Sequence, residues 1–124
     1  MKYKFTILIT IVITILCVIP VPDVPELGEV PFFDKWVHFV MFGSMTFAMY
    51  LDRKFTKQNI NIIFILIAFL LPSLWGGLME LVQNYCTTCR SGDWLDFYAD
   101  AFGAFLSTLL SLLLWKIVKT SVQK

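Results

Sequence analysis

Four long apolar runs constrain the fold of this chain more than any other feature of its sequence. They cover residues 5–21, 36–51, 62–78 and 97–118, which is more than half of the 124 residues. Each run is close to the about 17 to 25 residues that a helix needs to cross a bilayer. The composition agrees, because only 15% of the residues are charged, whereas a soluble domain carries about a quarter. We therefore expect an all-α membrane protein.

The segments between these runs are too short to form a separate soluble domain with its own core. We expect one domain over residues 1–124, a bundle of four transmembrane helices at about residues 5–21, 34–51, 60–84 and 94–118. Lys2 and Lys4 precede the first run, as they would in a signal peptide. No A-x-A-like cleavage site follows this run, so we expect the first helix to be retained.

The charged residues predict how the bundle lies in the membrane. With the N-terminus inside, eight of the ten basic residues fall on one side, and eight of the nine acidic residues fall on the other. Because cytoplasmic loops carry an excess of Lys and Arg, we expect both termini in the cytoplasm and the acidic side outside. The expected location is the bacterial cytoplasmic membrane. The sequence has no basic stripe with interleaved aromatic residues, so no nucleic-acid partner is expected.

Three polar clusters are expected on the outer side. The motif DKWVH can present Asp34, Lys35 and His38 on one helix face, since residues three and four apart are neighbours. The motif ELVQ places Glu80 and Gln83 one turn apart near the outer end of the third helix. The third cluster, CRSGDWLDFYAD, contributes Arg90, Asp93, Asp96 and Asp100.

Some of these acids are expected to lie inside the spans. Asp100 is seven residues beyond Asp93, about 10 Å along a helix, and Glu80 is similarly distant from its loop. An acid within a span costs on the order of 2.5 to 3.5 kcal/mol on insertion scales and is a functional candidate by default. Taken alone, Asp93 and Asp96 also fit capping roles at a helix start, and His38 also fits a structural role. The convergence of the clusters favours a site open to the exterior.

The acids of these clusters outnumber the cations available to them. Five carboxylates face two fixed cations and one histidine. The chain could meet this deficit by raising carboxyl pKa values, by admitting water, or by binding a cation or a cationic ligand.

These motifs resemble the VanZ-like family of small bacterial membrane proteins. The family pattern is a D-K-x-x-H motif, an E-x-x-Q motif, and an Arg followed by spaced acids and a Gly. In this sequence it corresponds to DKWVH, ELVQ and residues 90–103, so the resemblance extends from Asp34 to the end of the fourth helix. Asp100 stands where the family commonly has Asn. The pair Cys86 and Cys89 is particular to this chain.

The resemblance implies a protein connected with the cell envelope. The founding member of the family gives bacteria low-level resistance to the lipidated glycopeptide teicoplanin, which acts at the outer face. It therefore implies that an outer polar site binds or modifies an envelope lipid, a cell-wall precursor or a lipoglycopeptide. Membrane lipid is an expected partner, a homo-oligomer is left open, and no cofactor is identified.

The site residues support two chemical readings. In the enzyme reading, His38 and Glu80 act as acid and base on a lipid-linked substrate, and Asp93 or Asp96 orients them. A histidine with three carboxylates suits a hard divalent cation, but this spacing is not diagnostic, and we assign no metal site. In the binding reading, cations contact an anionic group and acids accept hydrogen bonds. The ligand-binding residues are then Asp34, Lys35, Gln83, Arg90 and Asp100.

A third reading is a proton-coupled transporter, with Glu80 and Asp100 as a relay. Four helices without an inverted repeat disfavour it unless the protein oligomerises.

Cys86 and Cys89 form a C-x-x-C motif in the second outer loop. Outside a bacterial membrane, a local disulfide is the expected state of such a pair. Two free thiols and a metal or redox role are the alternatives, and two cysteines without a second ligand pair are a weak zinc signal.

Small residues predict where the helices approach one another closely. The fourth helix has Ala99, Gly103, Ser107 and Ser111 at intervals of four, a small-xxx-small face. In the third helix, Gly76 lies one turn after Pro72, so a kink or a close approach is expected about two turns before Glu80.

Overall fold

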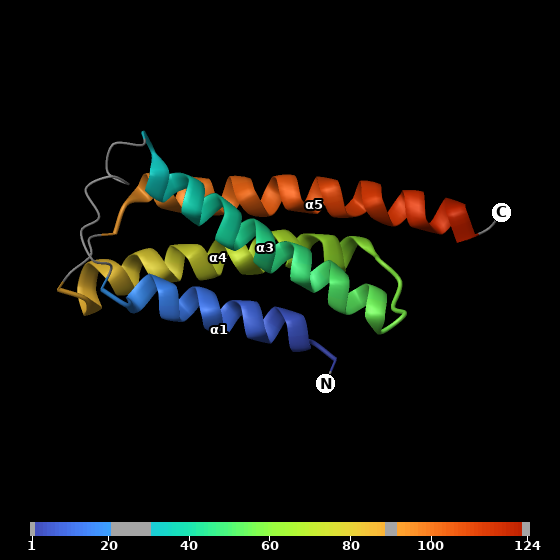
Figure 1. The fold of residues 1–124 in the computed structure, drawn as a ribbon, viewed down its shortest axis with the longest axis horizontal. Coiled ribbons are helices and arrows are strands. Elements are labelled where there is room, and N and C mark those ends of the chain that lie inside the picture. The colour runs from blue at the N-terminus through green and yellow to red at the C-terminus, as the bar shows by residue number, and fades with distance from the viewer. Residues whose placement is uncertain (1, 21–30, 89–91, 123–124) are drawn as a thin grey trace.

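The fold is known from a computed structural model that describes residues 2–20, 31–88 and 92–122. These residues form four α-helices and no strand: α1 (Lys4–Val18), α3 (Phe33–Phe55), α4 (Ile62–Cys86) and α5 (Trp94–Val122). The predicted all-helical class is confirmed for the described part of the chain. The helices lie along the long axis of the molecule, and successive helices run in opposite directions (Figure 1).

This up-and-down arrangement creates two ends with different chemistry (Figure 1). At one end α1 and α4 begin and α3 and α5 end. We call it the basic end, because Arg53 and Lys54 lie in the last turn of α3 there. At the other end α3 and α5 begin and α4 ends. We call it the acidic end, because Asp34 and Asp96 lie in the first turns of α3 and α5 there.

The helix bounds differ from the expected ones in ways that local chemistry explains. α1 ends at Val18 rather than 21, and Ile19 is extended, since the residue before a proline avoids the helical region. α3 continues four residues past the expected end, to Phe55. Its last turn carries Lys54, which is exposed, and Arg53, whose guanidinium lies 4.2 Å from the centroid of the Phe64 ring. α4 contains Pro72 within a single helix, so the proline does not end it.

Side-chain caps define three of the helix starts. The side chain of Asn61 accepts a hydrogen bond from the Phe64 N–H at 2.9 Å and begins α4. Asp93 Oδ1 accepts from the Leu95 N–H at 2.9 Å, which is the capping role expected for this residue at the start of α5. The start of α1 is capped by Asp52, a residue of α3.

Asp52, near the end of α3, caps α1 across the helix interface. Its carboxylate accepts hydrogen bonds from the Phe5 N–H at 3.2 Å, the Thr6 N–H at 2.9 Å and the Thr6 hydroxyl at 2.7 Å. The first N–H groups of a helix lack partners within it, so a carboxylate there satisfies them and is favoured by the helix dipole. The buried Asp52 therefore has a structural role that the sequence pattern does not reveal.

α3 is the central helix, and its largest interface is with α5. The two backbones meet at glycines. A Cβ added at Gly43 would lie 3.2 Å from the Gly103 carbonyl oxygen, and one at Gly103 would collide with the Phe39 carbonyl oxygen. The small-residue face of α5 thus provides the close approach that its spacing predicts, at Gly103.

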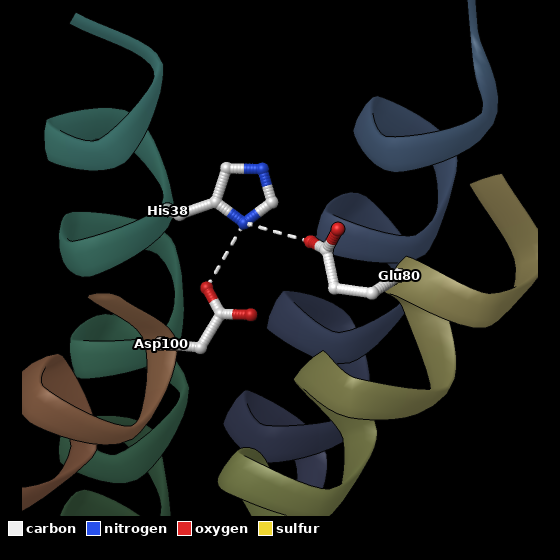
Figure 2. Close-up of side chains that lie close together, drawn as sticks. All are labelled: His38, Glu80 and Asp100. Carbon is white, nitrogen blue, oxygen red and sulfur yellow. Dashed lines mark hydrogen bonds and ion pairs between the residues drawn. The ribbon is translucent and has the colours of Figure 1, made fainter. Parts of the chain in front are cut away.

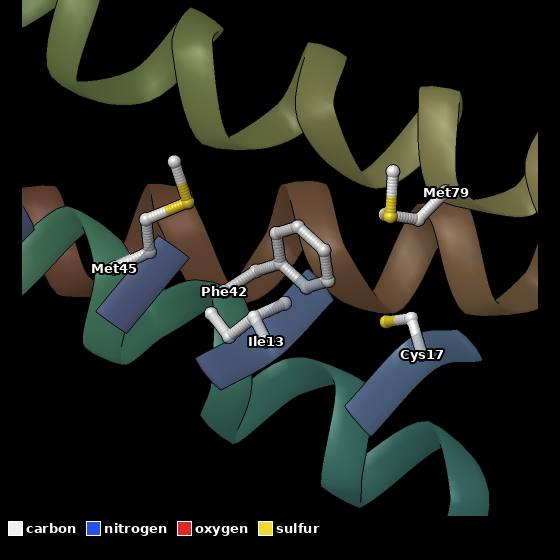
Figure 3. Packing of buried hydrophobic residues seen from close by; sticks show 5 residues of the cluster. All are labelled: Ile13, Cys17, Phe42, Met45 and Met79. Atoms are coloured by element: carbon white, nitrogen blue, oxygen red, sulfur yellow. The ribbon is translucent and has the colours of Figure 1, made fainter. Parts of the chain in front are cut away.

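The apolar core lies between α1, α3 and α4, next to the polar residues of the acidic end. Figure 3 shows its five buried residues, whose side chains interlock across the three helices. Phe42 also stacks on the ring of His38, with 6.2 Å between centroids and 16° between planes. The core therefore fixes the orientation of a residue in the polar cluster. Its members are Ile13, Cys17, Phe42, Met45 and Met79.

Two of the described helices are long and apolar enough to cross a membrane: α4, and α5 over Trp94–Val118. α1 has the composition but only 15 residues, a rise of about 22 Å. α3 carries charged residues in its first and last turns. All four helices leave large apolar side chains exposed, among them Leu8, Val40, Leu74 and Leu113.

Candidate functional site

The polar cluster of the acidic end is formed by three helices. α3 contributes residues from its first two turns, α4 from the turns before its end, and α5 from its first two turns together with its cap. Because α4 runs opposite to α3 and α5, its C-terminal end lies beside their N-terminal ends (Figure 1). The members of the cluster, as its ion pairs connect them, are Asp34, Lys35, His38, Glu80, Asp93, Asp96 and Asp100.

His38 lies at the centre of the buried part (Figure 2). Its Nδ1 is 3.0 Å from Asp100 Oδ1, within hydrogen-bond distance, and 3.6 Å from Glu80 Oε1. Its Nε2 is 3.9 Å from Asp96 Oδ2. His38 and Glu80 are each 4% exposed and Asp100 is fully buried. Three carboxylates thus surround one imidazole, away from solvent.

Lys35 forms the outer part of the cluster. Its Nζ lies 2.7 Å from Asp34 Oδ2, 2.8 Å from Asp93 Oδ2 and 3.0 Å from Asp96 Oδ1. The hydrogen bond from this ammonium, together with one from the Leu95 N–H, holds the pKa of Asp93 below its usual range. Asp96 contacts both Lys35 and His38, so it connects the outer part to the buried part.

Three buried carboxylate oxygens lack a hydrogen-bond partner among the described residues: Glu80 Oε1, Asp96 Oδ1 and Asp100 Oδ2. Asp96 Oδ1 still forms an ion pair with Lys35, whereas Lys35 contacts neither Glu80 nor Asp100. The other Glu80 oxygen, Oε2, accepts from the Asp93 N–H at 2.7 Å. Buried polar atoms without partners are uncommon in native proteins, and each calls for an explanation.

Glycines make room for the buried carboxylates. A Cβ at Gly76 of α4 would collide with Asp100 Oδ2, and one at Gly92 would collide with the Glu80 carbonyl oxygen. Any larger residue at Gly76 would displace the Asp100 carboxylate. The predicted close approach in this part of α4 is present, and it serves the site.

Three predicted features of the site are not found among the described residues of this cluster: Gln83, Arg90 and the Cys86–Cys89 disulfide. Gln83 is buried, and its Nε2 donates to the Cys17 carbonyl oxygen at 3.0 Å, which ties α4 to the end of α1. Arg90 and Cys89 lie outside the described residues. The Cys86–Cys89 disulfide therefore remains a prediction.

An apolar groove adjoins the cluster between α3 and α5. It has a volume of about 370 Å³, and Lys35 lies at its edge. The sequence does not predict this groove, because its two walls come from separate helices; its only local signal is the aromatic residues Phe32 and Trp36 near the start of α3. Its lining residues are Phe32, Lys35, Trp36, Phe39, Ala99, Phe102 and Leu106. A larger cavity, about 430 Å³, lies at the basic end, far from the cluster.

The geometry suits two kinds of ligand. The atoms of His38, Glu80 and Asp100 that could bind a cation lie within 4.8 Å of one another, and so do those of Asp34, Asp93 and Asp96. The groove suits an apolar chain. No known protein family, curated protein or solved structure matches this chain.

Proposed function

We propose that the chain is a multi-pass protein of the bacterial cytoplasmic membrane in which all four helices cross the bilayer. The exposed apolar side chains on each helix support this, because soluble proteins rarely carry so extensive an apolar surface. The charged residues of α3 lie in its first and last turns, where a spanning helix meets the polar headgroups. α1 packs against α3 and α4 and exposes Leu8 and Ile11, so it belongs to the same membrane unit.

The proposed orientation places the basic end in the cytoplasm and the acidic end outside. Basic residues concentrate where α3 ends and α4 begins, for example Arg53, Lys54 and Lys57. Cytoplasmic loops carry this excess of positive charge. Both termini are then cytoplasmic, and the polar cluster opens toward the cell exterior.

We propose that the acidic end binds a lipid-linked component of the cell envelope. The observation that carries this proposal is the groove between α3 and α5, whose lining is apolar except for Lys35, a residue of the polar cluster. An amphiphile whose acyl chain filled this groove would have its headgroup at the cluster. The resemblance of the motifs to the VanZ-like family suggests a cell-wall precursor or a teicoplanin-type lipoglycopeptide.

Modification of the bound headgroup is part of the same proposal. The hydrogen bond between His38 and Asp100 orients an imidazole that can accept or donate a proton, and Glu80 is a second acid or base beside it. His38 lies one turn after Lys35 on α3, and Lys35 is the residue of the cluster that lines the groove. His38, Glu80 and Asp96 would carry this chemistry, with Asp93 holding Lys35 in place.

The groove is tested by filling it. We expect Ala99→Trp to abolish copurification of a lipid-linked compound with the detergent-purified protein, as measured by mass spectrometry, because the indole would occupy the groove. Leu81→Trp is the matched control, since Leu81 is exposed on α4 outside the groove. Equal lipid content in Ala99→Trp and the control would contradict the proposal. A bound lipid whose mass changes with the wild-type protein but not with His38→Gln would assign it a modifying activity.

A further inference from the structure

The buried part of the cluster has more negative charge than its described cations can balance. Lys35 already contacts three carboxylates of the outer part and does not contact Glu80 or Asp100. Among the described residues, His38 is the only cationic group that does contact them. One positive charge at most therefore faces two buried carboxylates. Such an imbalance is costly in a low-dielectric interior, and binding another cation is one of the three ways to relieve it.

The side chains of Glu80 and Asp100, which carry unpartnered oxygens, both contact His38 Nδ1, Glu80 through Oε1 and Asp100 through Oδ1. Glu80 Oε1 points toward His38, and the carboxylate of Asp100 lies across from it, below the imidazole (Figure 2). Neither Glu80 Oε1 nor Asp100 Oδ2 has a hydrogen-bond partner in the described chain, although the side chains are 4% and 0% exposed. Water at the surface therefore does not satisfy them. One carboxylate oxygen of Glu80, one of Asp100 and one ring nitrogen of His38 lie within 4.8 Å of one another, and they come from three different helices.

The separations between these atoms are those of ligands around one metal ion. His38 Nδ1 lies 3.0 Å from Asp100 Oδ1 and 3.6 Å from Glu80 Oε1. Metal–nitrogen and metal–oxygen bonds of about 2.0 to 2.2 Å place neighbouring ligands about 3.0 to 3.5 Å apart in octahedral or tetrahedral geometry. Only small side-chain movements would then be needed to bind an ion.

We infer that His38 Nδ1, Glu80 and Asp100 form a binding site for one divalent metal ion. One imidazole and two carboxylates are a donor set that Zn²⁺ and Mn²⁺ accept. Asp96 completes the site as an outer partner. Its Oδ2 is 3.9 Å from His38 Nε2, an ion-pair contact that is too long for a hydrogen bond, so Asp96 would move closer to accept from the Nε2–H while Nδ1 binds the metal. Gly76 preserves the space for the Asp100 carboxylate.

The outer carboxylates do not form an equivalent site. Asp34, Asp93 and Asp96 also have oxygens within 4.8 Å of one another. However, Lys35 Nζ lies 2.7 to 3.0 Å from an oxygen of each. An ammonium group already fills the position that a metal ion would take. The two carboxylate groups therefore differ, and the difference provides a control for the experiment.

A metal ion would also change what the acidic end can bind. The carboxylates alone repel an anionic headgroup, whereas a divalent cation between Glu80 and Asp100 would neutralise them and remove this repulsion. This consequence rests on the proposed function. The metal site itself rests only on the buried side chains.

The test measures metal binding by the full chain, purified in detergent and stripped with a chelator. We expect Zn²⁺ or Mn²⁺, titrated separately, to bind at about one ion per chain and to raise the unfolding temperature. Asp96→Asn should weaken binding by about 10- to 100-fold, as loss of an outer partner does. Glu80→Gln and Asp100→Asn should weaken it further. Asp34→Asn should leave it unchanged.

A spectroscopic measurement on the wild-type protein avoids reliance on variants that fold poorly. With Mn²⁺ bound, pulsed electron paramagnetic resonance should show coupling to one imidazole nitrogen, and His38→Gln should remove it. No binding by the wild-type chain, no nitrogen coupling, or loss of binding in Asp34→Asn would each overturn the inference. Ala99→Trp should still bind the metal, because Ala99 lines the groove and not the metal site. The lipid proposal can therefore fail while the metal inference holds.

Discussion

At the scale of single residues, the site depends on Lys35 and His38 having different partners one turn apart on α3. Lys35 projects to the outer carboxylates and His38 to the buried ones, and Asp96 touches both. The ring of His38 is held by Phe42 on one side and by the Asp100 hydrogen bond on the other. A fixed imidazole between carboxylates is a pre-organised acid, base or metal ligand.

Asp93 permits a prediction about pH. Its pKa is lowered by Lys35, so its contribution to stability is present above the unfolded carboxyl pKa, about 3.9, and is lost as the pH falls through the lower folded value. Asp93→Asn keeps an oxygen that can cap α5 but removes the charge. We expect the variant to unfold at a lower temperature than the wild type at pH 6. The difference should close below about pH 4.

This prediction is checked by thermal unfolding in detergent over a series of pH values. Asp34→Asn is a second variant for comparison. It also removes a carboxylate that contacts Lys35, but Asp34 caps no described helix start, so the loss of the charge is measured without a change at the cap of α5. If the difference in unfolding temperature between Asp93→Asn and the wild type instead grew as the pH fell, the contact with Lys35 would not stabilise the folded state.

At the scale of helices, the interface between α3 and α5 positions the site and the groove together. Gly103 lies directly against the Phe39 backbone, and Phe39 and Phe102 line the groove on the two sides of this contact. Their rings are tilted against each other with 5.9 Å between centroids. The spacing that lets the backbones touch at Gly103 therefore also sets the distance between His38, which precedes Phe39, and Asp100, which is three residues before Gly103.

Two glycine substitutions distinguish the effect of this backbone contact on stability from the general effect of alanine on helix stability. Alanine favours a helix over glycine by about 1 kcal/mol at either position. At Gly103 the new Cβ would meet the Phe39 backbone, and we expect Gly103→Ala to destabilise the protein by about 1 to 3 kcal/mol. At Gly77 it would lie 3.3 Å from the ring of Phe97, which can move, so Gly77→Ala should change stability by less than about 1 kcal/mol.

Thermal unfolding of both variants tests this expectation. If Gly103→Ala were as stable as Gly77→Ala, the helices would not depend on direct backbone contact.

At the scale of the whole molecule, polarity is arranged with apolar side chains on the outside of the helices and charges at the ends and in one buried cluster. Leu74 and Val40 are 68% and 61% exposed, while Asp100 is fully buried. This arrangement is unstable in water but suited to a bilayer, where buried polar groups must find their partners inside the bundle. The proposed orientation follows from the separation of acidic and basic residues between the two ends.

The orientation is tested by thiol labelling. Cys86 is exposed at the acidic end, so after reduction a membrane-impermeant maleimide should label it, or Cys89, in intact cells. A matched control is Lys57→Cys at the basic end in a chain with Cys86 and Cys89 replaced by Ser. This thiol should react only after permeabilisation. Labelling in the reverse order would place the polar cluster in the cytoplasm.

The sequence predicted the helices and the residues that lie together at one end of the bundle. Apolar runs and the capping residue Asp93 predicted helices close to the observed ones, because these signals act over a few neighbouring residues, but the expected first helix ran past Pro20 and the observed one ends at Val18. The up-and-down order of four short-linked helices also predicted that DKWVH, the end of α4 and the start of α5 would share one end. It could not predict the role of Asp52, since its partners Phe5 and Thr6 are far away in the chain.

What the sequence by itself determined was the helical class, the division into a basic and an acidic end, and the set of ionisable residues at the latter. Only the tertiary structure decided their pairing: Lys35 with the outer acids, His38 with Glu80 and Asp100, and Gln83 with the backbone of α1. Helical periodicity specifies the direction of a side chain around its own axis. Which neighbouring helix it meets, and at what distance, depends on how glycines and core side chains pack the helices together.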